Sequence, residues 1–179
     1  MHTYLVFLRG VNVGGKAMIK MAELTEALTT SGLSNVKTYI QSGNVIISSE
    51  MTDTEKLTSH ITTVIKKKFN LDVSVVIFSE SEWRDIIAAA PAWWGADKTW
   101  KHNMLIMIKP AEPEDVIAAI GEIRPEIETI EPGLGILYQS LSLKMFGRTS
   151  VHKLVANPIY KQVTIRNYNT ATKLLSLLT

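Results

Sequence analysis

The sequence predicts an α+β protein made of two halves that share one order of strands and helices. Three observations support this. Apolar runs typical of strands alternate with helical stripes, the series occurs twice along 179 residues, and 46% hydrophobic with 20% charged residues is an ordinary globular composition. The expected domains are residues 1–90 and 102–179, and a Trp-rich connector at 91–101 joins them.

The first half begins with 3–9, which is apolar on both faces and is therefore typical of a strand covered on both sides. Met21, Leu24 and Leu28 then form one helical stripe that stops near Gly32. Short β-rich runs predict three more strands, and the capping patterns Thr52-x-x-Glu55 and Ser79-x-x-Glu82 open two more helices. These strands are expected at 36–40, 45–48 and 73–78, and the helices at 52–69 and 79–90.

The second half repeats this order. Strands are expected at 103–108, 127–130, 135–145 and 163–166, and helices at 112–121, 151–155 and 171–178. Pro132-Gly133 is expected to form the turn between the second and third strands. Two successive β-α-β-β-α-β series, each followed by an extra helix, predict two ferredoxin-like halves.

Composition excludes several classes of function. The chain has no cysteine, so disulfides, iron–sulfur sites and cysteine nucleophiles are excluded. The four histidines are scattered without ligand spacing, so we predict no metal site and no cofactor. No apolar stretch approaches the roughly 20 residues that span a bilayer, and the N-terminus does not resemble a leader. We therefore expect a cytoplasmic protein without a membrane partner.

Charge is distributed unevenly, although the net charge is only +2. Seven acids and one base lie within 110–131, whereas six bases and no acid follow from 132 to the end. The basic segment is either a positive surface for phosphates or a neighbour that the acidic segment neutralises.

A glycine-rich loop follows the first strand. The run from Gly10 to Lys16 has the spacing of a phosphate-binding P-loop, but Ala17 stands where the magnesium-binding hydroxyl belongs. The next helix also begins too late for that motif. The sequence thus argues against nucleotide hydrolysis and supports a simpler anion site made of Arg9, Asn12, Gly14, Gly15 and Lys16. Alternatively, the glycines serve only an irregular turn and Arg9 pairs with a carboxylate.

Two further polar clusters are candidate ligand contacts. Gln41 and Asn44 flank a Ser-Gly turn that the strand order places near the end of the first strand. A hairpin turn stabilised by Ser and Asn side chains also explains them, and we favour that interpretation. Arg166 and Asn167 precede the last helix, where Asn167, Asn169 or Thr170 could serve as the N-cap. Capping does not explain Arg166, which is the best ligand candidate of the second half.

Tryptophans gather in the connector. Trp93, Trp94 and Trp100 could stack on a flat ligand, or they could fix the connector to the body of the protein by burying large apolar rings. We favour the structural interpretation.

Motifs at both ends of the chain resemble one protein family. The run Tyr4-Leu-Val-Phe-Leu-Arg-Gly-Val-Asn-Val-Gly-Gly-Lys16, then Ile19-Lys20-Met21, Leu24 and Tyr39-Ile-Gln-Ser-Gly-Asn-Val45, is similar to the bacterial family called domain of unknown function 1697 (DUF1697). The closing Arg166-Asn-Tyr-Asn-Thr170 resembles the C-terminal signature of that family. The resemblance implies an α+β fold with two ferredoxin-like halves, and no established reaction, cofactor or partner.

Three hypotheses for function remain open. The first is a binding module for a phosphate-bearing ligand, a nucleotide or nucleic acid, at the glycine-rich loop. The second is an enzyme acting on a small anionic substrate, although neither loop motif contains a carboxylate or histidine as general acid or base. The third is a protein-interaction or self-associating module. The sequence leaves the oligomeric state open.

Overall fold

The computed structural model describes residues 1–15 and 17–178, which divide into two compact units. The first unit comprises Met1–Arg84 and the end of the chain from Leu178; the second comprises Asp85–Leu177. Helix α3 (Glu80–Ala88) runs across this division. None of the helices in the described residues is long and apolar enough to cross a bilayer.

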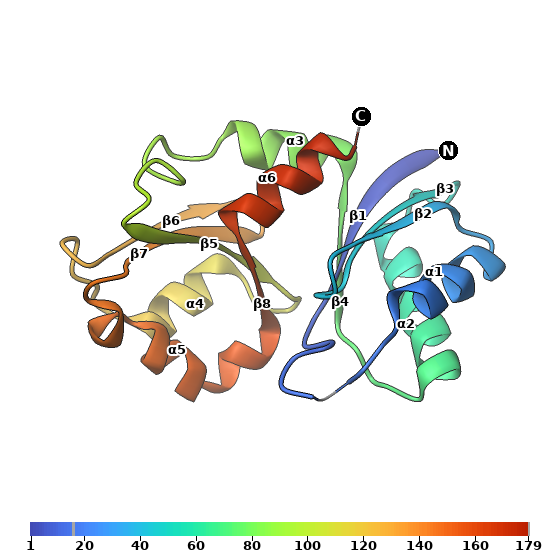
Figure 1. Cartoon of the computed structure of the whole chain (residues 1–179), viewed down its shortest axis with the longest axis horizontal. Coiled ribbons are helices and arrows are strands. Elements are labelled where there is room, and N and C mark those ends of the chain that lie inside the picture. The colour runs from blue at the N-terminus through green and yellow to red at the C-terminus, as the bar shows by residue number, and fades with distance from the viewer. Residues whose placement is uncertain (16, 179) are drawn as a thin grey trace. The chain divides into compact units, whose positions relative to one another are not determined.

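The first unit is a four-stranded antiparallel sheet with two helices on one face (Figure 1). The strand order is β2-β3-β1-β4, so that β1 and β3 are the central strands. Its elements are β1 (His2–Leu8), α1 (Met21–Thr30), β2 (Ser34–Tyr39), β3 (Asn44–Ser49), α2 (Thr54–Phe69) and β4 (Val75–Ser79).

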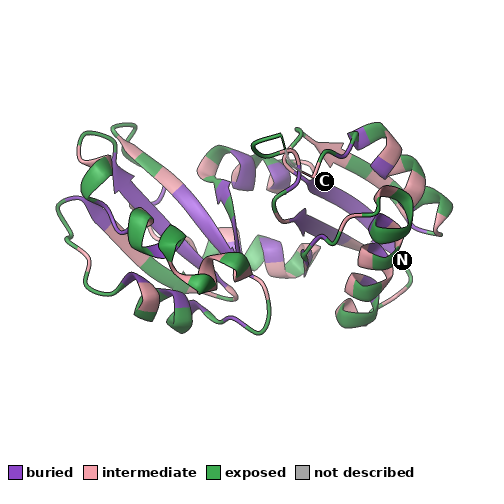
Figure 2. Ribbon diagram, turned by 90° about the horizontal axis from the view of Figure 1, so that it is seen from below, coloured by how far each residue is buried: buried purple, intermediate pink, exposed green. Residues whose placement is uncertain are grey.

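Both faces of the central strands β1 and β3 are buried, as the continuous apolar sequence of β1 predicts. Val6 and Leu8 share the core with Leu24 of α1 and Leu57 of α2. On the opposite face, Phe7 packs against Trp83 of α3, with ring centroids 5.1 Å apart. Figure 2 shows the buried residues concentrated in the strands, while much of the surface of the helices is exposed.

The second unit repeats the arrangement. Its antiparallel sheet has the order β6-β7-β5-β8, and α4 and α5 share a core with it that includes Leu105, Val116, Leu137 and Leu154. The elements are β5 (Trp100–Met107), α4 (Pro113–Ile120), β6 (Glu128–Gly133), β7 (Ile136–Ser142), a 3₁₀ turn (Phe146–Arg148), α5 (Val151–Ala156), a second 3₁₀ segment (Pro158–Gln162), β8 (Val163–Asn167) and α6 (Tyr168–Ser176).

The α+β class is confirmed: the described residues form two four-stranded antiparallel sheets and six α-helices. The start of α1 at Met21, several residues after the glycine-rich loop, is also confirmed. The capping pattern at Ser79 is present, since Ser79 N–H donates to the Glu82 carboxylate and Glu82 N–H donates to Ser79 Oγ.

Three local predictions are wrong. The strand expected at 135–145 ends at Ser142, and residues 143–145 form a bend and a turn before the next 3₁₀ segment. The N-cap of α2 is Asp53, not Thr52, because the Asp53 carboxylate accepts hydrogen bonds from both Glu55 and Lys56 N–H. Pro132-Gly133 belongs to strand β6 instead of forming the turn. Because β6 is an edge strand, the missing N–H of proline need not break a ladder hydrogen bond, and the turn moves to 134–135.

Candidate functional site

The glycine-rich loop leaves the C-terminal end of the central strand β1. It is a run of alternating backbone conformations in which Gly10, Asn12, Gly14, Gly15 and Ala17 all have positive φ. The consecutive φ values of +59° at Gly14 and +73° at Gly15 lie in the left-handed region that favours glycine. Asn12 N–H donates to Ala17 O at 3.1 Å across this tip. Gly14 and Gly15 therefore adopt a backbone conformation that glycine tolerates without strain.

Asn12 holds the base of the loop together. Its Nδ2 donates to Ile19 O at 2.9 Å and to Gln41 O at 2.8 Å, and its Oδ1 accepts from Ile19 N–H at 2.8 Å. Both donors of the side-chain amide are thereby used inside the protein. Asn12 ties the two ends of the loop to one another and to the turn that begins at Gln41.

The turn at 41–44 packs directly beneath the loop. Leu8 N–H donates to Gly43 O at 2.8 Å, and a Cβ added at Gly43 would lie 2.6 Å from Val11 Cγ2. Asn44 is fully buried, and its Nδ2 donates to Tyr39 O and to Ser42 Oγ. The structure thus brings the two clusters of the first half together, and the amides of Asn12 and Asn44 serve the fold.

The tip of the loop is open to solvent. Val13, Gly14 and Gly15 are exposed, and Val13 retains 63% of its accessible surface. Within residues 1–15 and 17–178, neither Gly14 N–H nor Gly15 N–H has a hydrogen-bond acceptor in the protein. Two adjacent backbone donors are therefore free to meet a ligand here.

Cationic residues precede and follow the loop in the chain. Arg9 is half-buried directly after β1, where its backbone N–H donates to Ser74 O at 2.9 Å. Lys20, at the far end of the loop, is exposed and forms an ion pair with Glu23 at 3.0 Å. Lys16, the fifth predicted member of the site, lies outside the described residues.

Arg166 and Asn167 belong to the second unit. Arg166 is 6% exposed and donates from Nη1 to Thr164 Oγ1 and to Ile165 O, each at 2.8 Å. Burial lowers the pKa of the Arg166 guanidinium to about 10, so it remains a cation at neutral pH. Asn167 is the N-cap of α6 and accepts from Thr170 N–H at 2.8 Å. Their participation in one site with the loop stays a prediction.

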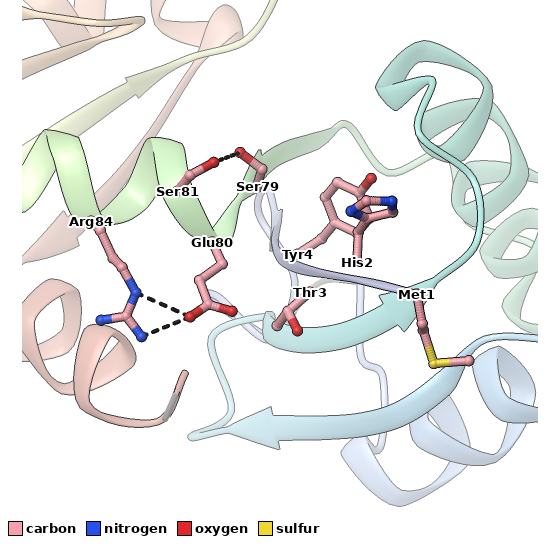
Figure 3. A pocket seen from close by; sticks show the side chains of 8 residues that line it. All are labelled: Met1, His2, Thr3, Tyr4, Ser79, Glu80, Ser81 and Arg84. Atoms are coloured by element: carbon pink, nitrogen blue, oxygen red, sulfur yellow. Dashed lines mark hydrogen bonds and ion pairs between the residues drawn. The ribbon is translucent and has the colours of Figure 1, made fainter.

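A pocket of about 420 Å³ lies at the opposite end of β1 from the loop. Figure 3 shows its lining, in which Arg84 turns onto Glu80 and Ser79 faces Ser81. Because Glu80 Oε1 accepts from both Nε and Nη2 of Arg84, the charge of the one arginine in the lining is neutralised locally. No sequence motif marked this pocket; its lining residues are Met1, His2, Thr3, Tyr4, Ser79, Glu80, Ser81 and Arg84.

The second unit contains a serine–histidine contact that sequence reasoning missed. Ser140 Oγ lies 2.6 Å from His102 Nδ1, and His102 Nε2 lies 2.7 Å from Asp97 O. The two residues are opposite each other on β5 and β7, a pairing that only the strand register reveals. Ser140 is 4% exposed, so a substrate cannot reach its hydroxyl. The contact holds the connector segment at Asp97 against the sheet.

Glu128 is a second buried polar centre of this unit. It is 1% exposed, and its carboxylate accepts from Gln139 Nε2 at 2.9 Å and from both Oγ and N–H of Ser150 at 2.7 Å. Three hydrogen bonds satisfy the buried charge. Glu128 therefore joins β6 and β7 to the start of α5.

Trp94 is a structural residue of the connector. It is 5% exposed, its Nε1 donates to Asn103 O at 2.8 Å, and its ring meets those of Tyr138 and Tyr168 edge-on. The ring is therefore buried among aromatic neighbours, as the structural interpretation predicted. Trp93 and Trp100 are half-buried.

The chain is similar to solved structures and matches the model of a protein family. The chain is similar to the structure of a conserved bacterial protein, SP0830, from Streptococcus pneumoniae, with 30% identity, 99% coverage of both chains and a TM-score of 0.87. No curated protein sequence matches. The model of the family described as protein of unknown function (DUF1697) matches residues 1–138. The chain therefore belongs to the DUF1697 family of proteins of unknown function.

Proposed function

We propose that this protein binds a phosphate-bearing ligand, a nucleotide or nucleic acid, at the tip of the glycine-rich loop. The observation that carries the proposal is the pair of exposed backbone N–H groups at Gly14 and Gly15, which have no acceptor among the described residues. Successive backbone N–H groups in a turn conformation form concave sites for anions, and Gly14 and Gly15 both lie in a turn. Arg9, which directly precedes the loop, and Lys16, which follows Gly15 in the sequence, would add positive charge to the ligand site.

The rigidity of the loop supports binding. A flexible loop must lose conformational entropy when it closes on a ligand, and a loop already held in place loses less. Here the three hydrogen bonds of Asn12 and the close packing of Gly43 beneath Val11 fix the base before any ligand arrives. The ligand contacts would then come from the tip, and Asn12, Gln41 and Asn44 would support it from below.

The proposal is for binding and not for nucleotide hydrolysis. Ala17 cannot supply the hydroxyl that a P-loop offers to magnesium, and α1 begins only at Met21. In a P-loop a helix follows the glycine-rich loop directly, so that its N-terminus faces the phosphates. Here α1 begins several residues after the loop and does not have that position in the sequence.

Calorimetric titration with inorganic phosphate, nucleoside mono-, di- and triphosphates and a short oligonucleotide tests the proposal. We expect saturable binding by inorganic phosphate or at least one nucleotide, weakened tenfold or more by the double variant Arg9→Gln/Lys16→Gln. Oligonucleotide binding that this variant leaves unchanged would lie outside the loop. The control is Lys67→Gln/Lys68→Gln, which removes two exposed charges from the last turn of α2. Equal affinity of both double variants would overturn the proposal, as would the absence of binding to every ligand at low salt.

A second candidate function is protein interaction or self-association around the same loop. Three large apolar side chains are exposed on the loop and on the turn beneath it: Val13 at 63%, Met18 at 68% and Ile40 at 50%. Exposed apolar groups gathered around one feature are typical of interaction surfaces. Light scattering would show a concentration-dependent increase in mass that Met18→Ser abolishes; a monomer at every concentration would exclude self-association.

We also propose that both units are ferredoxin-like and that the protein is cytoplasmic. The first is supported by the repeated order β-α-β-β-α-β and by strand orders that place the first and third strands of each unit at the centre. The second is supported by the absence of cysteine from the sequence.

A further inference from the structure

The 3₁₀ turn Phe146–Arg148 of the second unit lies within a group of four exposed cations. They are Lys101 on β5, Arg124 in the segment before β6, Lys144 and Arg148, and together with Phe146 we call them the basic turn surface. The antiparallel pairing of β5 with β7 brings these separate segments together, since Lys101 lies opposite Leu141, three residues before Lys144.

Specific contacts hold this surface together. Arg124 Nη2 donates to Arg148 O at 3.0 Å, which places the guanidinium at the end of the 3₁₀ turn. Lys101 Nζ lies 5.5 Å from the centre of the Phe146 ring, in cation–π geometry. The Phe146 ring is half-exposed. Positive charge and an aromatic ring thus occur side by side on this surface.

The acidic segment does not neutralise this surface by ion pairing. Among the described residues, no carboxylate lies within 4.0 Å of a side-chain nitrogen of any of the four cations. Glu128 is buried and directed to Ser150, while the exposed Glu122 and Glu126 flank only Arg124 in sequence. Most of the positive charge therefore remains available to a ligand.

We propose that the basic turn surface binds single-stranded nucleic acid. Phosphates of the backbone would contact the four cations, and an unpaired base would stack on Phe146. Stacking requires a base that is not paired, which favours a single strand over a duplex. This site is formed by the second unit and does not depend on the glycine-rich loop.

Fluorescence anisotropy of the full-length protein with a labelled 12-nucleotide single strand tests the proposal at 50 and 200 mM salt. Four phosphate contacts on a single strand predict that affinity falls about 50-fold over this range. The triple variant Lys101→Gln/Lys144→Gln/Arg148→Gln should bind at least tenfold more weakly at 50 mM and lose about two units of the logarithmic salt slope. Arg124 is left intact because it supports the turn.

The matched control is Lys37→Gln/Lys67→Gln/Lys68→Gln, which removes three exposed lysines from the first unit. Equal loss in both triple variants would overturn the proposal. The variant Arg9→Gln/Lys16→Gln, which tests the glycine-rich loop, should bind the oligonucleotide within twofold of wild type. A loss confined to that variant would place nucleic-acid binding at the loop and overturn the basic turn surface.

Phe146→Leu separates base stacking from phosphate contact. We expect about a fivefold or greater loss of affinity for the single strand with retained circular dichroism, because stacking on an aromatic ring contributes substantially per base. Tighter binding of the single strand than of a duplex of the same sequence is also expected. Two outcomes would overturn the assignment. One is that Phe146→Leu binds the single strand as tightly as wild type. The other is that the protein binds inorganic polyphosphate, an acidic peptide or anionic vesicles of matched charge as tightly as it binds the single strand.

Discussion

Replacing Asn12 with glycine tests whether this side chain holds the loop. Glycine adopts φ of +55° without strain, so the substitution removes hydrogen bonds while leaving the backbone conformation accessible. Three bonds are lost, and two of them satisfy N–H and C=O of Ile19, which is 2% exposed. At a net 0.5–1.5 kcal/mol each, we expect the free energy of unfolding to fall by about 3 kcal/mol.

Urea unfolding measures this loss, and amide hydrogen exchange at Ile19 reports it locally. The control is Asn35→Gly, also at positive φ (+51°) in the first unit, where the side chain makes one bond of 3.2 Å to Ser48 Oγ. The control should lose no more than about 1 kcal/mol. If Asn12→Gly loses no more than the control and leaves exchange at Ile19 unchanged, the loop is not held as described.

Three further predictions concern the surroundings of the loop and helix α2. Gly43→Ala places a methyl group 2.6 Å from Val11 Cγ2 at a φ of +73°, and we expect it to reduce the free energy of unfolding by about 3 kcal/mol. The control is Gly32→Ala, which has open space around the added methyl group and should reduce that free energy by only about 1 kcal/mol. Urea unfolding measures both values. Ile40→Asn should raise the free energy of unfolding by about 1 kcal/mol, because a β-branched residue at φ of +51° is strained and this one is half-exposed; a loss of stability would contradict that reasoning. Asp53→Asn should reduce the acid sensitivity of stability. Hydrogen bonds from Lys56 and Glu55 N–H lower the pKa of Asp53 in the folded protein below 3.8. The ionised carboxylate therefore stabilises the fold at pH values above the pKa of Asp53 in the unfolded chain. This stabilisation is lost as the pH falls through the lower pKa of the folded protein. Unfolding curves of both proteins between pH 2 and 6 (roughly the span of carboxyl titration) would check the difference.

The sequence predicted the fold where one local signal was sufficient. Met21, Leu24 and Leu28 marked α1 because helix burial repeats every three or four residues, and all three are buried. The cap of α2 was misplaced by one residue because Thr52 and Asp53 are both good caps, and only geometry shows which oxygen faces the free N–H groups.

The candidate site was predictable in its location but not in its contacts. The glycines and the Gln41–Asn44 turn indicated two neighbouring loops, and the packing of Gly43 under Val11 confirms that they are adjacent. The sequence could not show that Asn12 bonds to Ile19 and Gln41, since such bonds depend on the path of the loop in space. The contact of Ser140 with His102 was hidden for a similar reason, because it requires the register of β5 against β7.

The most direct test of the central claim is an NMR titration that follows the amide resonances of Gly14 and Gly15 as a phosphate-bearing ligand is added. We expect saturable shifts at these two amides, with Gly32 as the internal control because its N–H already donates to Thr29 O. An anion site at the loop would be contradicted if the ligand shifted amide resonances elsewhere but not those of Gly14 and Gly15. The absence of any shift at every ligand concentration would contradict it as well.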